Sequence, residues 1–184
     1  MRRFTAKEGS AAVEFALLAP VMVASFFGVI ESCELISANR RAEKGAAALA
    51  DVIARFVEVK GTDICDTFTG VESLTTPQAA GDLRARVTSI NVDSQKVARV
   101  EWSAVRGTGF TALAKNTVVT DQVPERLRMA SENQPLVKSE VTLVYRSRFI
   151  FFVAPTITLT HEEYRRPRLV GALPRIDTTS PCGA

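Results

Sequence analysis

A single carboxylate stands at the head of a long apolar run near the N-terminus. Glu14 is followed by residues 15–30, which read FALLAPVMVASFFGVI and carry no charge. An acidic side chain in a membrane-spanning helix costs roughly 2.5–3.5 kcal/mol at the bilayer centre and less near its edge. This position therefore requires charge compensation, either by reaching the headgroup region or by pairing with a cation.

The apolar run has the length of a membrane-spanning helix. With the small residues 10–13 it reaches about 20 residues, which is what a bilayer requires. Basic residues precede it and acidic residues follow it, namely Arg2, Arg3 and Lys7 before and Glu31 and Glu34 after. Under the positive-inside rule the N-terminus stays in the cytoplasm. Everything after residue 35 is then expected outside, which in a bacterium is the periplasm.

Two cleaved-signal interpretations fit the N-terminus poorly. A secretory signal needs a small-x-small site after the apolar run, where this chain has Glu31, Ser32, Cys33 and Glu34. A lipoprotein signal would attach lipid to Cys33, but Glu31 stands where a small residue is expected. An uncleaved signal anchor stays open, with Glu14 reaching the headgroups.

Three cysteines are present, Cys33, Cys65 and Cys182. In an oxidising compartment we predict a disulfide between Cys65 and Cys182, tying a long loop to the tail. Cys33, at the end of the span, is harder to pair and is left over.

A helical stripe continues beyond the predicted span. Its apolar members recur in steps of three and four at Leu35, Ala38, Ala42, Ala46, Leu49, Ile53 and Phe56. One helix is therefore expected from about residue 10 to residue 58, close to 70 Å long. The alanine-rich patch GAAALAD at 45–51 should permit close approach by whatever packs on it, most simply the sheet. Residues 61–82 lack periodicity and contain glycine and proline, so they are expected to form a connecting loop.

The second half of the chain alternates with a period of two, which indicates strands. The first strand begins at Leu83, and a phase shift near Thr88 and Ser89 predicts a β-bulge. A hairpin turn is expected at 93–96, and a helical turn at 111–116 within an otherwise irregular connection. The other strands are predicted at 98–104, 137–149 and 156–164. The expected fold is α+β, with the long N-terminal helix packed on a roughly four-stranded antiparallel sheet.

The residues do not predict catalysis, a metal or a cofactor. The only histidine, His161, stands in LTHEEYRRPR, where the order lacks the second histidine of a His-Glu-x-x-His zinc site. No nucleophile elbow, phosphate loop or Cys-x-x-Cys pair occurs. The net charge of +3 is scattered, so no nucleic-acid partner is expected. Arg165, Arg166 and Arg168 are interpreted as a solvated charged edge, with a partner contact as the alternative.

A short basic leader ends in Gly9, followed by Ser10, with Glu14 fifth and Phe15 sixth after the glycine. This arrangement resembles the cleavage region of type IV pilin-like proteins. Together with EVTLVYRS, EEYRRPRL and the late Cys182, it is similar to the TadE-like pseudopilins of tight adherence (Tad/Flp) pilus systems. Phe15 stands where tyrosine is frequent in that family, which leaves a sister pseudopilin open.

The resemblance implies cleavage between Gly9 and Ser10 by a prepilin peptidase and a non-catalytic role in assembling adhesive pili. Its implied partners are that peptidase, other Tad pseudopilins, the major pilin and the inner-membrane assembly platform. Cleavage would create an α-ammonium on Ser10 about 6 Å along the helix from Glu14, whose charge it could neutralise. The implied segments are a leader at 1–9, a membrane helix at 10–34, its periplasmic continuation at 35–60, a sheet domain at 83–164 and a tail at 165–184. A signal-anchored periplasmic binding domain remains the alternative.

Overall fold

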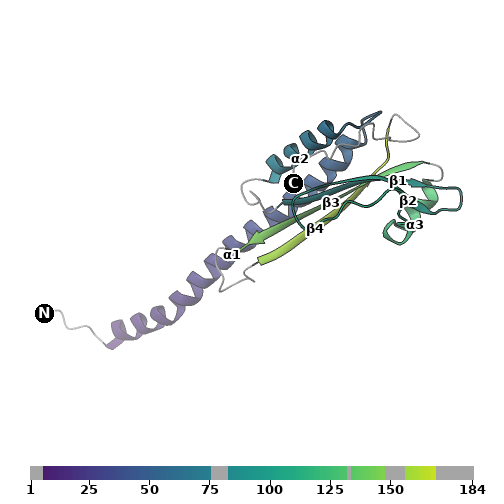
Figure 1. Ribbon diagram of the computed structural model, residues 1–184. Coiled ribbons are helices and arrows are strands. Elements are labelled where there is room, and N and C mark those ends of the chain that lie inside the picture. The colour runs from purple at the N-terminus through teal and green to yellow at the C-terminus, as the bar shows by residue number, and fades with distance from the viewer. Residues whose placement is uncertain (1–5, 76–82, 132–133, 148–155, 169–184) are drawn as a thin grey trace.

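The computed structural model describes residues 6–75, 83–131, 134–147 and 156–168, and shows an α+β fold (Figure 1). The four strands form one antiparallel sheet in the order β2-β1-β3-β4. The predicted fold class is confirmed. The elements are α1 (Ala6–Ile53), α2 (Gly61–Thr75), β1 (Leu83–Val92), β2 (Ala98–Arg106), the 3-10 turn η1 (Thr120–Gln122), α3 (Glu125–Ala130), β3 (Pro135–Arg146) and β4 (Thr156–Arg165).

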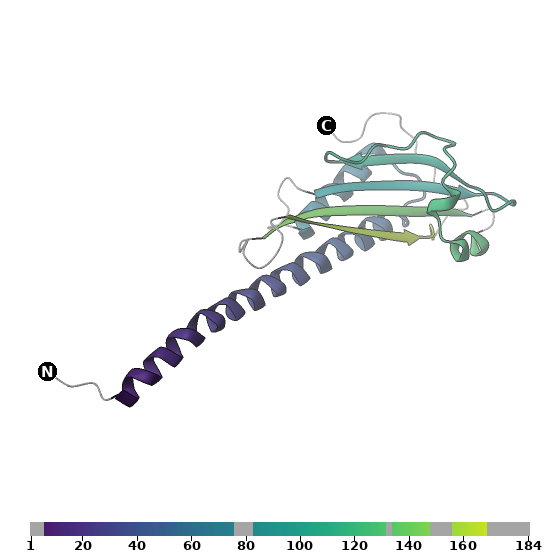
Figure 2. The ribbon, with the colours of Figure 1, turned by 90° about the horizontal axis from the view of Figure 1, so that it is seen from below.

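Helix α1 spans 48 residues, or about 72 Å at the usual rise per residue. Its C-terminal half lies against the sheet while its N-terminal half extends well beyond it (Figure 2). The predicted stripe is confirmed, because Ala38, Ala42, Ala46, Leu49 and Ile53 are all fully or almost fully buried. The helix begins earlier and ends earlier than expected, at Ala6 and at Ile53.

The small residues of this stripe allow close contact with β3 and α2. The hydroxyl of Ser139 on β3 donates a hydrogen bond of 2.7 Å to the backbone carbonyl of Ala46. A Cβ atom at Gly45 would lie 3.2 Å from a methyl group of Val71 on α2. Alanine and glycine therefore bring α1 close to both neighbours, as the alanine-rich patch predicts.

The predicted loop at 61–82 is wrong for its first part, which forms α2. Ile64, Phe68, Val71 and Thr75 are buried and recur at helical spacing. This helix was not predicted from the sequence because the residues between the buried ones include glycine and several threonines, which have low helix propensity. Packing on α1 and the sheet supplies the stability that propensity does not. A carboxylate oxygen of Asp63 also accepts a hydrogen bond of 3.0 Å from the backbone N–H of Lys60 at the helix start.

The predicted phase shift near Thr88 and Ser89 is confirmed, but the bulge that accompanies it lies in β2 and not in β1 as predicted. Strand β1 pairs Ser89 with Trp102 and Ile90 with Val100, so Glu101 is the extra residue of a bulge in β2. On one side of this bulge, Val87 of β1 and its partner Ala104 of β2 face α1 and α2 and join the main core. On the other side of the bulge, the pair Ile90 and Val100 joins a second core on the opposite face of the sheet. The bulge lets the apolar positions of β2 change faces together with those of β1.

The connection between β2 and β3 covers the second core. Val119, Val123 and Leu127 pack there against the ends of the strands. The expected helical turn at 111–116 is wrong, since this stretch runs along β2 and the backbone N–H of Asn116 donates to the carbonyl of Val100 at 2.7 Å. The helical turns come later, at η1 and at α3. The predicted hairpin turn is confirmed, with Asp93 accepting from the backbone N–H groups of Gln95 and Val97.

Candidate functional site

Gly9 and Ser10 lie within the first turns of α1, which continues without interruption through Glu14 and Phe15. Ser10 and Glu14 are four residues apart, so they share one face of the helix and are separated by about 6 Å along its axis. The Glu14 side chain is exposed, and Phe15 is 68% exposed. The predicted processing and assembly residues are thus brought together at the tip of a projecting helix.

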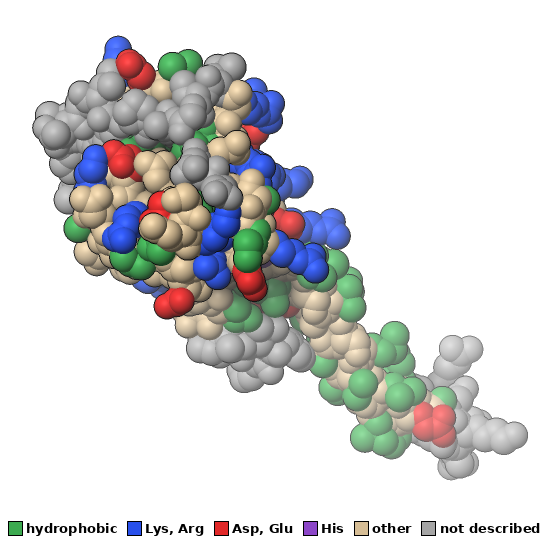
Figure 3. Space-filling view, turned by 90° about the vertical axis from the view of Figure 1, so that its right-hand side faces the viewer, with side chains coloured by type: hydrophobic (Ala, Val, Ile, Leu, Met, Phe, Trp, Pro, Cys, Tyr) green, Lys and Arg blue, Asp and Glu red, His purple; other side chains and the backbone are tan. Residues whose placement is uncertain are grey.

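Apolar side chains cover the face of the projecting half of α1 that the space-filling view shows (Figure 3). Among the described residues, α1 is the helix that is long and apolar enough to cross a membrane. None of its most apolar segment is buried in the protein. An apolar surface of this length is suited to membrane anchoring. Its exposed large members include Val13, Phe15, Leu17, Leu18, Val21, Met22, Val23, Phe26 and Val29.

The anchor joins the body at Glu31, which lies inside the membrane helix predicted at 10–34. Glu31 is fully buried, and the hydroxyl of Tyr145 on β3 donates a hydrogen bond of 2.8 Å to its carboxylate. The signal was present, because Glu31 lies one turn before Leu35 on the same buried stripe. The body therefore reaches down to residue 31, and the fully exposed apolar stretch is shorter than the predicted span of 10–34.

The arginine-rich stretch after β4 ties the end of the sheet to the end of α1. The backbone N–H of Arg168 donates to the carbonyl of Ala54 at 3.1 Å, and its guanidinium donates to Asp51 at 2.8 Å. A hydrogen bond from Arg55, aided by Arg168, holds the pKa of Asp51 below its ordinary value of 3.8. Tyr164 donates to the carbonyl of Gln122 at 2.7 Å. For Arg168 and Tyr164, the Tyr-x-x-Pro-Arg stretch thus has an internal structural role.

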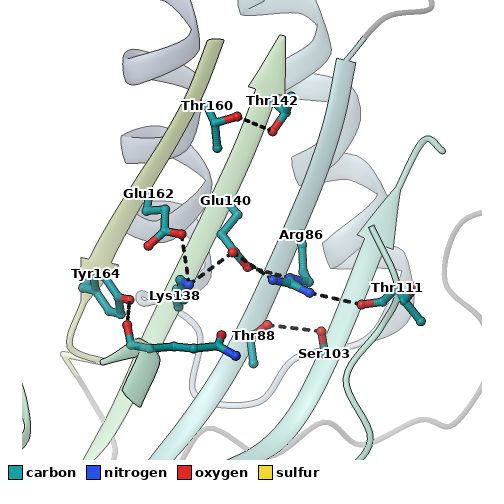
Figure 4. Close-up of polar contacts among 11 residues, drawn as sticks. Arg86, Thr88, Ser103, Thr111, Lys138, Glu140, Thr142, Thr160, Glu162 and Tyr164 are labelled. Atoms are coloured by element: carbon teal, nitrogen blue, oxygen red, sulfur yellow. Dashed lines mark hydrogen bonds and ion pairs between the residues drawn. The ribbon is translucent and has the colours of Figure 1, made fainter. Parts of the chain in front are cut away.

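A charged network crosses the face of the sheet opposite α1 (Figure 4). Glu140 on β3 accepts two hydrogen bonds from Arg86 on β1, at 2.5 and 2.8 Å. Lys138 lies 3.1 Å from Glu140 and 3.2 Å from Glu162 on β4. The Glu140 side chain is only 7% exposed and that of Lys138 only 5%. Burial alone would raise the pKa of Glu140, but the hydrogen bond from Arg86 and the charge of Lys138 outweigh it and lower the pKa below 4.5.

Glu140→Gln should flatten the response of stability to acid. Because the folded-state pKa of Glu140 is lowered, its ionised form stabilises the fold above the unfolded-state pKa, and this contribution is lost as pH falls through the lowered value. At neutral pH the variant should lose roughly 1–3 kcal/mol, since buried donors lose their charged acceptor. Urea unfolding at a series of pH values from about 3 to 7 measures both effects. Glu43→Gln, at an exposed acid on α1, is the control, and parallel curves for wild type and Glu140→Gln would contradict the prediction.

The structure places the remaining candidates in ordinary surroundings. An imidazole nitrogen of His161 lies 2.9 Å from the amide oxygen of Asn39, joining β4 to α1. Within the part of the chain that is described, no group of three or more His, Cys, Asp or Glu side chains could hold a metal ion. Cys65 is disulfide-bonded and Cys33 is a free, exposed cysteine. Cys182 lies outside the described residues, so its pairing with Cys65 stays a prediction.

The helix that carries these residues is similar to a known protein family. Residues 9–51 match the family model described as TadE-like protein. This match lies within α1. The TadE-like match begins at Gly9, includes Ser10, Glu14 and Glu31, and ends two residues before the end of α1. No curated protein and no solved structure matches the chain. A TadE-like match on an apolar N-terminal helix indicates a membrane-anchored component associated with Tad pili.

Proposed function

We propose that the chain is a non-catalytic pseudopilin of a Tad/Flp pilus system, cut after Gly9 by a prepilin peptidase and required to assemble the pilus. One observation carries this proposal: Ser10 and Glu14 lie one helical turn apart at the head of an exposed apolar helix, inside a TadE-like match. Cleavage would create an α-ammonium on Ser10 about 6 Å along the helix axis from this carboxylate, close enough for the two charges to pair.

Cleavage converts the amide nitrogen of Ser10 into an α-ammonium group. In a low-dielectric setting a lone carboxylate and a lone ammonium each carry a desolvation cost, which their pairing offsets. The pair can form within one subunit or between the ammonium of one subunit and Glu14 of its neighbour. In the second case the pair forms only when subunits associate, which would couple processing to assembly.

The helical conformation at Gly9 is compatible with access by a peptidase. The scissile bond lies within the first turns of α1, which begins at Ala6. Helix ends open at little free-energy cost, and a glycine weakens a helix by about 1 kcal/mol relative to alanine. Local opening of this turn would present the Gly9–Ser10 bond in an extended form.

The proposed topology follows the charge asymmetry around the span. The basic leader stays in the cytoplasm, α1 crosses the inner membrane once, and the sheet domain lies in the periplasm. In this arrangement the partners are the prepilin peptidase, the other Tad pseudopilins, the major pilin and the inner-membrane assembly platform. The same chain would serve adhesion and biofilm formation through the pilus that it helps to build.

Mass measurement of the chain from its native membrane tests the proposal. With the peptidase present, the mature protein should begin at Ser10, nine residues shorter than the gene product, and without it the leader should remain. Gly9→Leu should block this loss. Gly28→Leu is the matched control, because a side chain at this other glycine of α1 meets nothing within 4 Å. A wild-type chain that keeps Met1 in a cell assembling pili would overturn the proposal and favour a signal-anchored periplasmic binding domain.

A further inference from the structure

The body exposes an apolar pocket between its two long helices. The α1–α2 pocket has a volume of about 500 Å³, and its apolar lining includes Val52 and Phe56 from α1 and Leu74 from α2. Val52 is 39% exposed and Leu74 is 55% exposed. Asp63 and Asp66 of α2 also line it. The α1–α2 pocket therefore combines apolar walls with negative charge, which suits an apolar side chain next to a basic one.

The acidic character of this pocket comes from Asp63 and Asp66. The helix sequence GTDICDTFTGVESLT contains no lysine or arginine, and its third acid, Glu72, pairs with Arg106 of β2 at 3.2 Å. A neighbour that approaches α2 through this pocket consequently meets negative charge without a competing positive side chain from the same helix. Complementary charge in a partner would steer it to the pocket and set its orientation.

Helix α3 presents the complementary combination on the same chain. Met129 is 57% exposed, although large apolar side chains are usually covered. Arg126 is also exposed and lies three residues before Met129, so the two side chains share a helix face. Leu127 points to the opposite side and packs into the second core, which fixes the outward direction of Met129. Methionine is unbranched and adapts to irregular apolar pockets.

The two surfaces lie in different parts of the molecule. Figures 1 and 2 show α2 alongside α1, whereas α3 lies at the end of the sheet away from the N-terminus. A contact between them must therefore join two copies through unlike surfaces. Such a heterologous contact does not close on itself as a two-fold contact does, and it can extend from copy to copy.

We propose that Met129 and Arg126 of one copy dock into the α1–α2 pocket of a second copy, with Arg126 beside Asp66. The inference deepens the proposed function and rests on it for one point, namely that a shared membrane anchor holds all copies in the same up-down orientation. In that orientation the pocket of one copy meets α3 of a neighbour that stands lower or higher along the common axis. Repetition of this contact gives a staggered row of subunits.

Site-specific photo-crosslinking in the full chain tests this contact. A photoreactive amino acid replaces Val52, and isotopically light and heavy copies are produced together in the native membrane. We expect a crosslinked pair that joins the Val52 position of one isotopic form to the peptide containing Met129 of the other. A crosslink from position 52 to the same position of a second copy, a crosslink only to other proteins, or no crosslink would each overturn the inference.

A charge exchange separates this contact from general aggregation. Asp66→Arg should lower the yield of the Val52–Met129 crosslink about two- to fivefold, the range expected for an exposed ion pair. Adding Arg126→Asp in the same chain should restore it. Glu43→Arg, at an exposed acid of α1 outside the pocket lining, is the matched control and should leave the yield unchanged. Insensitivity to Asp66→Arg, or failure of the exchange to restore the yield, would contradict the inference.

The processing state of the same samples distinguishes the two proposals. Normal loss of the leader and normal piliation without the Val52–Met129 crosslink would refute the docking of copies and leave the pseudopilin role standing. An intact leader with a strong crosslink would refute the pseudopilin role and leave the contact between copies standing.

Discussion

Glu14→Gln is expected to abolish pilus assembly while leaving removal of the leader intact. The substitution keeps the shape of the side chain and removes only its charge, so the α-ammonium that the proposed cleavage creates on Ser10 would stay in an apolar setting without its partner. Breaking a buried charge pair in this way costs roughly 3–5 kcal/mol, which corresponds to more than about 100-fold in an association constant. The scissile Gly9–Ser10 bond is unchanged, so the peptidase should still act.

Two measurements on the same cells examine this expectation. Intact mass of the membrane-bound chain reports cleavage, and the amount of sheared pilus protein reports assembly. Glu43→Gln is the control, because Glu43 is an exposed acid of the same helix outside the apolar stretch. Wild-type piliation by Glu14→Gln would mean that assembly does not depend on charge pairing between Glu14 and the new N-terminus. Loss of both cleavage and piliation would reassign Glu14 to recognition by the peptidase.

Phe68→Ala is expected to lower the free energy of unfolding of the body by about 3–5 kcal/mol, the usual cost of removing a buried phenylalanine. Phe68 is fully buried in the main core, where α2 packs on α1 and the sheet. Small domains are stable by only about 5–15 kcal/mol, so a large part of the total would be lost.

The only tryptophan of the chain provides the measurement. Trp102 is 7% exposed and belongs to the same core as Phe68, so its fluorescence reports unfolding of that core in urea. Leu74→Ala is the matched control on α2, because Leu74 is 55% exposed and its loss should change stability by less than about 0.5 kcal/mol. If Phe68→Ala changed the free energy of unfolding as little as Leu74→Ala does, α2 would contribute little to the stability of the fold.

Much of the fold could be predicted because its signals are local. The buried stripe from Ala38 to Ile53, the presence of four strands and the phase shift at Ser89 all follow from periods of 3.6 and 2 read along the chain. Helix α2 could not be predicted in this way. Its buried residues include Phe68 at regular spacing, but Gly70 and several threonines mask the pattern, and its stability comes from packing on distant elements.

In the candidate site, too, contacts between residues close in the sequence could be predicted and contacts between distant residues could not. Gly9, Ser10 and Glu14 lie within one or two turns of a helix, so their relation is visible in the sequence. Glu31 meets Tyr145 from 114 positions away, and Arg86 meets Glu140 from 54 positions away. In the sequence Glu31 falls on the helical stripe, but nothing there indicates its partner Tyr145 or the pairing of Arg86 with Glu140. Contacts of this kind depend on strand register, which a single sequence specifies weakly.

The burial of Glu31 under the sheet has a mechanical consequence. Tyr145 holds α1 where it leaves the apolar stretch, and packing continues without a gap to Ile53. Within residues 31–53, therefore, α1 is packed on the sheet without a hinge, so this part of the helix and the sheet move together. A push that lifts this part of the helix by one turn, about 5.4 Å, lifts the whole sheet by the same distance.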